Sequence, residues 1–494
     1  MTDLLARGRF LLSGDPSAEV LIADGAAYLA DGRIVEVGGW PDLRRRHPRT
    51  AVVGDERHLV LPGLVNAHHH ARGASWLQRG HADEAVETWL LSFRGAAAVD
   101  AELDARYAGV RLLRSGVTTV LVSSYAPGPD AERQTRAAIA GLRSTGIRVA
   151  LAVGLLDRSA WQDHELRASL PPTLAERLER LVPAGAVDPA PQLALFTRLW
   201  DEAARDDGRG LTVLLGPVSP LWSSDELLSE VTRVAARTGA LVHTHALETR
   251  AQAAAARRRH GRPLLAHLAA AGFLSPRVSL AHCVALADED VDALASTGAT
   301  VVHNPGSNLR LRSGVADVAR LRRRGIPVAL GTDSQGLRDD DDLLIELGLA
   351  SVLARHDADG ALDGASAVAM ATVAGSRAAG LGDDAGAIRP GALADLTLLD
   401  LDALAGPVGV TAPAGVLNLV VGRATAAHVD TVIVGGCVVL SAGRPTLVDA
   451  EENARLLREA FAGIADDPAW AGLVRDLAPH VEAWSRELAA EVRA

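Results

Sequence analysis

The 494-residue sequence contains no lysine, so arginine accounts for all 50 of its basic residues. Aspartate and glutamate together number 61, which gives a formal net charge of −11. This acidic balance disfavours nucleic acid or an anionic membrane surface as a partner. The sequence also lacks an uncharged apolar run of about 18 residues, the length that a membrane-spanning helix needs. We therefore expect neither a nucleic-acid partner nor a membrane partner.

Cysteine and aromatic residues are scarce as well. The two cysteines, Cys283 and Cys437, lie far apart in the sequence, which is no disulfide framework and is typical of a reducing compartment. The first 16 residues lack the long apolar run and the cleavage site of a signal peptide. We therefore predict a cytoplasmic protein. Only 3% of residues are aromatic, so a tryptophan near a predicted site carries more weight than usual.

Hydrophobic residues make up 48% of the chain, enough for one large domain with one or two smaller ones. From residue 59 onward, short apolar runs alternate with amphipathic helical patterns. The runs are residues 59–67, 118–124, 148–156, 211–217, 240–246, 278–284, 300–305 and 327–333. Eight strand–helix units predict an α/β fold, a (β/α)8 barrel of the TIM type, with a doubly wound open sheet as the alternative.

Histidine and aspartate stand where these predicted strands end, which is where a barrel of this kind places its chemistry. His68 and His70 alternate along one strand and therefore point the same way, while His69 points away. The other polar residues at predicted strand ends are His243, His245, His282, His303 and Asp333. Imidazoles converging with a carboxylate predict a metal site suited to zinc or Fe(II).

The segments PGLVNAHHH, HTHALE, AHC, NPGSN and LGTDS resemble the amidohydrolase superfamily. The resemblance is to the branch that holds cytosine, guanine and adenosine-type deaminases and the triazine hydrolases, and it covers most of the chain. Spacing alone leaves His243 and His245 open as the third ligand, and the resemblance implies His245. The implied metal ligands are His68, His70, His245 and Asp333. Three imidazoles and one carboxylate leave room for a bound water.

The absence of lysine bears on the number of metal ions. Many amidohydrolases hold two metals bridged by a carboxylated lysine at the end of the fourth strand. The fourth strand here, in the segment LTVLLGPVSP, has no lysine and no nearby Glu or Cys substitute. We therefore expect one divalent metal per chain, zinc first and Fe(II) second.

The resemblance also implies catalytic roles for Glu248, His282 and Asp333. Asp333 would take a proton from the metal-bound water, His282 would orient the hydroxide or the electrophile, and Glu248 would protonate a ring nitrogen. From the sequence alone, Glu248 could be an acid at a helix start, and His282 a hydrogen-bonded barrel residue. The predicted reaction is hydrolytic deamination of an aminated purine, pyrimidine, pterin or triazine through a metal-bound hydroxide, releasing ammonia or an alkylamine. The alternative is hydrolysis of a cyclic amide or dechlorination of a triazine at the same site.

Substrate contacts are harder to predict. Trp76 and Gln78 lie in the long loop after the first barrel strand, and Trp222 in the loop after the fourth. A tryptophan can stack on a flat heterocycle and Gln78 can pair with its edge, although all three could equally be lid packing. His282 is the fourth predicted substrate contact.

Other polar residues near these strand ends receive plainer interpretations. We interpret His69, His243 and His303 as structural or ligand-supporting. Ser307 and Asn308 are predicted to shape a loop, and the acidic run 339–342 to start a helix.

Residues 1–58 and 386–445 show short strand patterns with turn glycines, and residues 446–494 form amphipathic helical patterns. The resemblance implies that the first two segments pair into one small β-sandwich domain beside a barrel of residues 59–385, with 446–494 as a helical tail. Family members commonly form homo-oligomers, so we expect a dimer or higher assembly acting on a small heterocyclic substrate.

Overall fold

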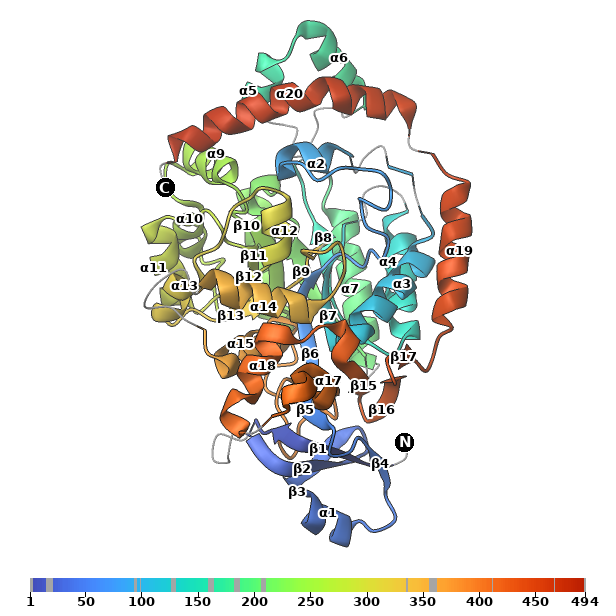
Figure 1. The fold of residues 1–494 in the computed structure, drawn as a ribbon. Coiled ribbons are helices and arrows are strands. Elements are labelled where there is room, and N and C mark those ends of the chain that lie inside the picture. The colour runs from blue at the N-terminus through green and yellow to red at the C-terminus, as the bar shows by residue number, and fades with distance from the viewer. Residues whose placement is uncertain are drawn as a thin grey trace.

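The structure is a computed structural model that describes most of the chain, organised around two β-sheets (Figure 1). The described residues are 3–14, 21–92, 96–97, 99–125, 130–158, 164–181, 187–205, 210–334, 336–354, 362–410, 412–465 and 467–492. One sheet is parallel and forms a barrel at the centre of the molecule. The other is mixed and lies at one end of that barrel.

Eight parallel strands pair in sequence order around the barrel. They are β6 (Leu64–His69), β7 (Val117–Ser123), β8 (Arg148–Leu155), β9 (Leu211–Pro217), β10 (Val242–Ala246), β11 (Val278–His282), β12 (Thr300–His303) and β13 (Val328–Leu330). A parallel bridge between His69 and Asp333 joins the last strand to the first, and the Asp333 amide donates to the His68 carbonyl over 2.9 Å. The predicted barrel is therefore confirmed over the open-sheet alternative.

The first predicted strand, residues 59–67, is two strands, so this prediction is wrong. β5 (His58–Pro62) pairs with the small sheet, and only β6 belongs to the barrel. The chain crosses between the sheets at Gly63, whose amide donates to the Asp395 carbonyl over 2.8 Å. A Cβ atom at Gly63 would lie 2.3 Å from the Thr118 hydroxyl oxygen, so the crossing needs glycine.

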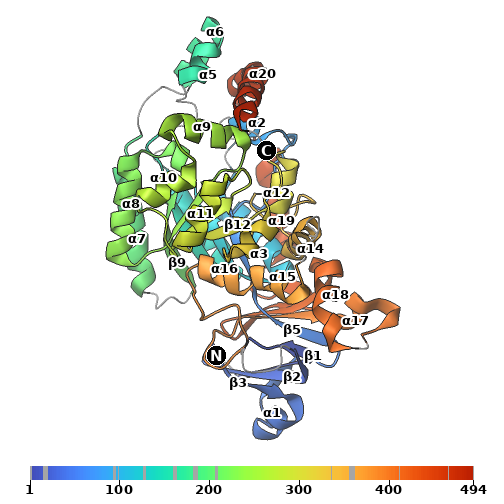
Figure 2. The same ribbon diagram turned by 90° about the vertical axis from the view of Figure 1, so that its left-hand side faces the viewer.

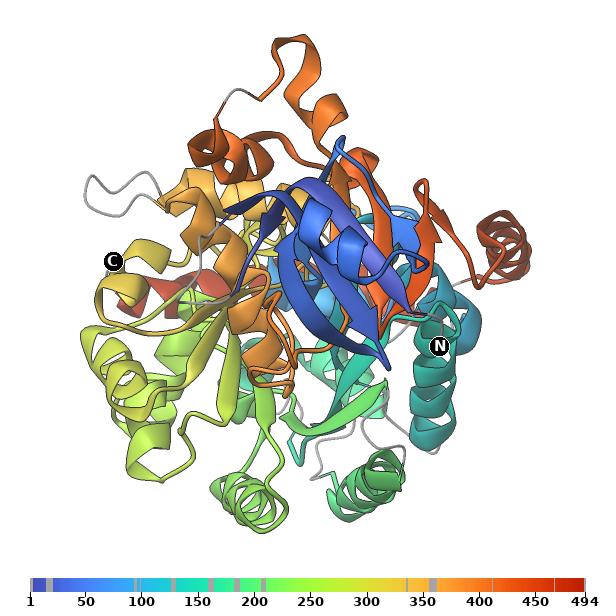
Figure 3. The same ribbon diagram turned by 90° about the horizontal axis from the view of Figure 1, so that it is seen from below.

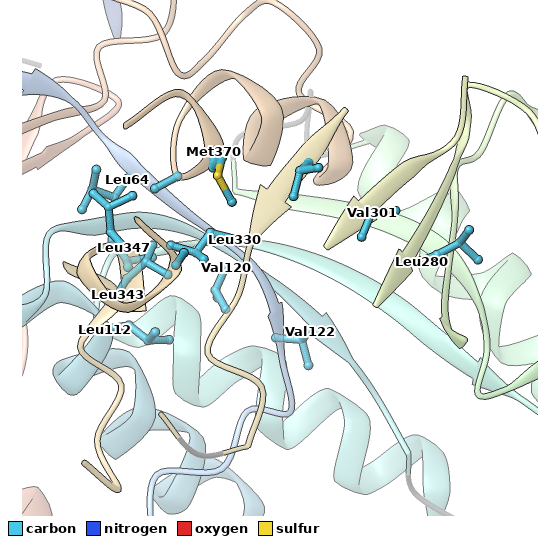
Figure 4. Packing of buried hydrophobic residues seen from close by; sticks show 14 of the residues in the cluster. Leu64, Leu112, Val120, Val122, Leu280, Val301, Leu330, Leu343, Leu347 and Met370 are labelled. Atoms are coloured by element: carbon cyan, nitrogen blue, oxygen red, sulfur yellow. The ribbon is translucent and has the colours of Figure 1, made fainter. Parts of the chain in front are cut away.

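Helices surround the barrel between successive strands, as the alternating pattern predicts. They are α3 (Ala101–Arg114), α4 (Ala131–Ser144), α7 (Ala190–Arg205), α8 (Asp225–Thr238), α9 (Arg250–His260), α10 (Leu264–Ala270), α11 (Asp288–Thr297), α12 (Pro305–Arg310), α13 (Val318–Arg323), α14 (Leu343–Ala354), α15 (Gly364–Met370) and α16 (Val373–Ala378). Their inner faces pack on the strands: Leu343 and Leu347 of α14 lie near Leu330 of β13 (Figure 4). Burying one such leucine stabilises the fold by about 1.5–3 kcal/mol.

The small sheet joins both ends of the chain in one nine-stranded arrangement, seen from below in Figure 3. Its other strands are β1 (Leu4–Leu12), β2 (Leu21–Ala30), β3 (Arg33–Gly39), β4 (Ala51–Val53), β14 (Leu396–Asp400), β15 (Val429–Val434), β16 (Cys437–Ser441) and β17 (Arg444–Pro445). β5 pairs antiparallel with β14, so the N-terminal strands meet the C-terminal strands there. Helix α1 (Trp40–Arg46) packs on β2 and β3.

A helical layer that we call the cover lies across the opposite end of the barrel (Figures 1 and 2). It comprises α2 (Val86–Ser92), α5 (His164–Ser169), α6 (Pro172–Leu181) and the long C-terminal helix α20 (Pro468–Glu491). These helices share one buried apolar cluster. The Trp470 indole Nε1 donates to the Leu91 carbonyl over 2.8 Å. α20 also packs on α9, and α19 (Ala450–Ala462) lies along α3.

No single helix within the described parts of the chain is both long enough and apolar enough to cross a membrane. One pair of helical segments, 401–408 and 413–423, meets that test only when the two are taken together, and it is bent by 109°. This pair contains α17 (Leu401–Ala405) and α18 (Val416–Arg423).

Candidate metal centre

Four strand ends bring their histidine and aspartate side chains to one point inside the covered end of the barrel. The ligand atoms of His68, His70 and His245 lie within 4.8 Å of one another, and so do those of His68, His282 and Asp333. The Asp333 Oδ1 atom lies 3.0 Å from the His70 Nε2 atom and 3.5 Å from the His68 Nε2 atom. The Nε2 atoms of His70 and His245 are 3.4 Å apart. Such convergence of nitrogen and carboxylate donors suits a divalent cation.

The hydrogen bonds behind these histidines direct their Nε2 atoms to the centre. The His70 Nδ1 atom donates to the Ser123 carbonyl over 2.9 Å, and the His245 Nδ1 atom donates to the Val218 carbonyl over 2.7 Å. A carbonyl only accepts, so both imidazoles carry their proton on Nδ1 and present a lone pair at Nε2. The His68 Nε2 atom is buried with no hydrogen-bond partner among the described residues. The three imidazoles therefore fit a metal ion.

The charge states of these groups also fit metal binding. Burial lowers the pKa values of His68 and His245 well below the usual range, and that of His282 to about 4. Neutral imidazole is the form that binds a metal. Burial opposes ionisation of Asp333, but its interaction with the neighbouring His68 and His70 imidazoles outweighs that effect and holds its pKa well below the ordinary value.

Asp333 is held in a defined orientation by its neighbours and its backbone. Its Oδ2 atom accepts from the Ser307 hydroxyl over 2.6 Å, which leaves Oδ1 facing the histidines. Its φ of 60° lies in the left-handed region, which is costly for a residue with a side chain and is common at functional sites. Ser307 thus orients the aspartate, a role that the loop-shaping interpretation misses.

His282 is oriented by two asparagines after β12, Asn304 at the start of helix α12 and Asn308 within it. Its Nδ1 atom lies 2.9 Å from the Asn308 side-chain nitrogen and 3.5 Å from that of Asn304. An amide NH2 group only donates, so His282 accepts at Nδ1 and carries its proton on Nε2. The prediction that Ser307 and Asn308 shape a loop is wrong, because both lie in helix α12, where Asn308 sets this tautomer. The Glu248 Oε1 atom lies 3.9 Å from the same nitrogen.

Glu248 is buried between the metal cluster and the cover. Burial raises its pKa well above the ordinary value, and the charges of Asp333 and Glu87 raise it further. The Ser313 hydroxyl donates to its Oε1 atom over 3.3 Å. Helix α9 begins only at Arg250 and is capped by Thr249, so Glu248 does not act as the cap. A buried carboxyl with a raised pKa beside the cluster is suited to hold a proton and donate it to a bound molecule.

Sequence reasoning missed Glu87. This residue of α2 accepts a hydrogen bond from the hydroxyl of Thr249, the residue after Glu248. Burial raises the pKa of Glu87. Its position in the segment ETWL, in the same long loop after the first barrel strand as Trp76 and Gln78, was the available signal. The contact ties the cover to the strand end that carries Glu248.

The predicted substrate-contacting residues have three different environments. Trp76 is buried and packs edge-to-face with Trp89, with ring centroids 6.2 Å apart. Gln78 is exposed, and its side-chain oxygen accepts from the Ser75 amide over 3.0 Å. Trp222 is half-buried at the end of a short 3-10 turn after β9. The packing of Trp76 and the local contact of Gln78 match the lid-packing alternative. Direct contact with the substrate stays a prediction for Trp76, Gln78 and Trp222.

His69 points away from the metal cluster, as the strand alternation predicts, into a buried ion pair. Its Nε2 atom lies 3.2 Å from Oδ1 of Asp341, and the Arg111 Nε atom lies 3.1 Å from Oδ2 of the same carboxylate. The acidic run therefore does more than start α14, where the Asp342 side chain accepts from the Leu344 amide over 3.1 Å. His303 is buried, and neither of its ring nitrogens has a hydrogen-bond partner in the described parts of the chain.

The fourth strand supplies a backbone group in place of a bridging lysine. β9 ends at Pro217, and the carbonyl of the next residue, Val218, accepts from His245. The described residues of this strand end offer no side-chain carboxylate or amine toward a second metal, and the single-metal centre stays a prediction.

Comparison with known proteins relates this arrangement to characterised enzymes. A sequence model of the Amidohydrolase family matches residues 59–439. The 5′-deoxyadenosine deaminase of Methanosarcina mazei is 31% identical over 460 residues, covering 92% of this chain and 96% of that protein. The 5-methylthioadenosine/S-adenosylhomocysteine deaminase of Moorella thermoacetica is 32% identical over 447 residues, covering 88% of this chain and 94% of that protein.

Two solved structures share the fold along nearly the whole chain. An adenosine deaminase from Xanthomonas campestris with bound zinc superposes with a TM-score of 0.78 at 27% identity, covering 94% of this chain and 99% of that one. An atrazine chlorohydrolase from Arthrobacter aurescens complexed with zinc gives a TM-score of 0.78 at 23% identity, covering 93% of this chain and 100% of that one. The second likeness is one of fold alone.

Proposed function

We propose a substrate and a mechanism for this chain, which belongs to the amidohydrolase family. The predicted enzyme class, a hydrolase acting on carbon–nitrogen bonds other than peptide bonds, is confirmed, and the chain is a deaminase. Within that class we propose that it removes the 6-amino group from adenine nucleosides that carry no 5′-hydroxyl, such as 5′-deoxyadenosine and 5′-methylthioadenosine. The products would be the corresponding inosine derivative and ammonia.

The observation that carries the proposal is the buried carboxyl of Glu248 beside the cluster of three histidines and Asp333. His68, His70, His245 and Asp333 would hold one divalent metal, zinc first and Fe(II) second. When bound, that metal supplies Lewis acidity and lowers the pKa of a coordinated water toward neutrality.

Each remaining side chain at the site has a separate task in deamination. Protonated Glu248 donates its proton to a ring nitrogen, which makes the carbon that bears the amino group more electrophilic. Asp333 accepts a proton from the attacking water, since its low pKa keeps it ionised. His282, with its proton on Nε2, can donate a hydrogen bond toward the attacking oxygen. The proton accepted by Asp333 then passes to the departing amine with the help of Glu248, and Glu248 regains a proton from the hydroxyl group added to the ring carbon, so that ammonia leaves and both carboxyl groups return to their starting states.

The cover lies where we expect contacts with the part of the substrate beyond the reacting ring, which is the ribose with its 5′ substituent. α2 contributes Glu87, which contacts Thr249 next to the proposed acid. Trp76, Gln78 and Trp222 come from the loops around the same end of the barrel and stay our candidates for substrate contact, with His282 at the reacting carbon. A homo-oligomeric assembly, a cytoplasmic location and the domain boundaries given above also stay predictions.

The test is an ammonia-release assay on purified, zinc-loaded protein. We expect the highest kcat/KM with 5′-deoxyadenosine or 5′-methylthioadenosine, a lower value with adenosine, and little release from guanine, cytosine or aminotriazines. The same preparation should contain about one metal ion per chain, as a single set of four ligands implies. Turnover of an aminotriazine or a cyclic amide without turnover of any adenine nucleoside would contradict the proposal.

A further inference from the structure

The three histidines of the metal cluster differ in what accepts their Nδ1 proton. His70 and His245 each donate to a backbone carbonyl. For His68 the partner is another imidazole: its Nδ1 atom lies 2.7 Å from the Nε2 atom of His243. A carbonyl is an acceptor in every state of the protein, whereas an imidazole nitrogen is an acceptor only when the ring proton sits on the other nitrogen.

The proton of His243 is placed by a second buried group. The His243 Nδ1 atom lies 2.7 Å from the hydroxyl oxygen of Ser279, which in turn can donate to the Val242 carbonyl over 3.4 Å. His243 and Ser279 are 0% and 2% exposed, so bulk water does not compete for these bonds. With the serine proton directed to the carbonyl, the serine oxygen accepts from His243 Nδ1, and His243 Nε2 accepts from His68.

The hydrogen bonds that link His68, His243 and Ser279 can run in two directions, and only one of them leaves His68 able to bind a metal. In that direction the proton of His68 is on Nδ1, and its buried Nε2 lone pair faces the Nε2 atoms of His70 and His245. In the reverse direction Ser279 donates to His243, His243 donates to His68, and the His68 proton points into the cluster. The Val242 carbonyl, which cannot donate, favours the first direction.

We propose that His243 and Ser279 are positioning residues that hold His68 in its Nδ1-protonated tautomer and thereby set the metal affinity of the centre. The inference rests on the proposed metal site and adds the two residues that set the tautomer of its ligand His68. It assigns a task to the other histidine of the HTH segment, which spacing alone cannot distinguish from His245. A hydrogen-bond partner behind a ligating histidine fixes its tautomer and typically changes metal affinity by about 10-fold to 100-fold.

The experiment compares zinc affinity across four variants of the full chain by competition with a chromophoric chelator. His243→Leu removes the acceptor, and we expect a dissociation constant for Zn²⁺ about 10-fold to 100-fold weaker than that of the wild type. His243→Gln can offer its amide oxygen to His68, so its affinity should return to within about threefold of the wild type. Ser279→Ala should weaken affinity by about threefold to tenfold, because it only releases the orientation of His243.

His303→Leu is the matched control. His303 is a buried histidine on the next strand but one, and neither ring nitrogen has a hydrogen-bond partner among the described residues. This variant should keep wild-type zinc affinity, which separates the loss of the hydrogen bond from the loss of a buried imidazole. The visible absorption spectrum of the Co²⁺-substituted protein gives a second readout, and we expect it to change in His243→Leu and to be retained in His243→Gln.

Two results would overturn the inference while leaving the proposed function intact. One is wild-type zinc affinity in folded His243→Leu, and the other is affinity in folded His243→Gln as weak as in His243→Leu. If His243→Leu does not fold, the zinc affinities of Ser279→Ala and His243→Gln test the inference instead. Wild-type zinc affinity in Ser279→Ala would then contradict it. A wild-type protein that binds no Zn²⁺ would instead contradict the proposed function.

Discussion

The metal centre and the cover lie at the same end of the barrel but are held by different interactions. The centre consists of strand-end side chains fixed by short, buried hydrogen bonds, such as that from the Ser307 hydroxyl to Asp333. The cover consists of helices from three distant parts of the sequence, joined by an apolar cluster and by the bond from Trp470 to Leu91. Directional bonds fix atoms within a few tenths of an ångström, whereas apolar packing fixes a shape.

This difference assigns separate parts of the reaction to the two regions. Metal binding and proton transfer need atoms at defined positions, and the strand ends provide them. Recognition of a nucleoside needs an enclosing surface that can vary between related enzymes, and the loops and helices of the cover provide it. Variants of the centre should therefore lower kcat or metal affinity, and variants of the cover should raise KM.

Glu248→Gln should have the largest effect on activity. The amide cannot protonate the substrate ring, so we expect kcat to fall by about 10²-fold to 10⁴-fold. Metal content should stay at the wild-type value, because Glu248 is not among the proposed ligands. The expected result is a strong loss of ammonia release with zinc content retained. The control is Glu289→Gln, which changes an exposed acid on α11 and should keep wild-type activity. Full activity in Glu248→Gln would remove the proton-donor role.

Arg111→Met tests the ion pair behind the centre. It leaves the Asp341 carboxylate, whose side chain is 2% exposed, without its guanidinium partner, and removing one member of a buried pair costs about 3–5 kcal/mol. Urea denaturation should show that loss in the free energy of unfolding. Arg324→Met breaks an exposed pair with Asp292 and should cost less than about 1 kcal/mol. Equal losses in the two variants would contradict this account of the buried pair.

Leu477→Ala tests the cover. Leu477 of α20 is 1% exposed within the apolar cluster, so the cavity should destabilise the docked helix by about 2–4 kcal/mol. We expect a severalfold rise in KM for the nucleoside with zinc content unchanged. Leu181→Ala, at a position that is 44% exposed on α6, is the control with little effect. A loss of zinc in Leu477→Ala would show that the two regions are not separable.

Glu346 should produce a smaller, pH-dependent effect on stability. Its carboxylate accepts from the Gly306 and Leu337 amides, and burial raises its pKa to about 7. Because the folded-state pKa lies above the unfolded value, stability present below about pH 4.5 is lost as the pH rises through about 7. The loss approaches about 3 kcal/mol above pH 7.

Comparing Glu346→Gln with the wild type isolates this contribution. The variant should lose less stability between pH 5 and pH 8 than the wild type does, when unfolding free energies are measured by urea denaturation at each pH. Parallel pH profiles of the two proteins would mean that Glu346 keeps an ordinary pKa.

Features encoded locally could be predicted from the sequence. The alternation of a strand places His68 and His70 on one face, and the apolar runs give the eight barrel strands with their polar ends. The split at Gly63 was missed although Pro62 and Gly63 interrupt the run, because the residues on both sides of them are apolar. Which sheet each half joins depends on a distant partner, β14.

Features that depend on long-range contacts were missed for the same reason. Arg111 and Asp341 meet across 230 positions of sequence, and Trp470 meets Leu91 across 379. The role of His243 depends on two other strands, because its partners are His68 of β6, across the barrel, and Ser279 of the adjacent strand β11. Nothing in the spacing of these residues indicates such pairs, because a hydrogen bond between strands is set by their order and register.

The central claim is that one metal, held by three histidines and Asp333, serves deamination with Glu248 as the acid. The most direct test measures zinc content and ammonia release from 5′-deoxyadenosine on the same samples of wild type and Glu248→Gln. The account predicts about one zinc per chain in both proteins, with turnover in the wild type alone. Two metals per chain, or equal turnover in both proteins, would contradict it.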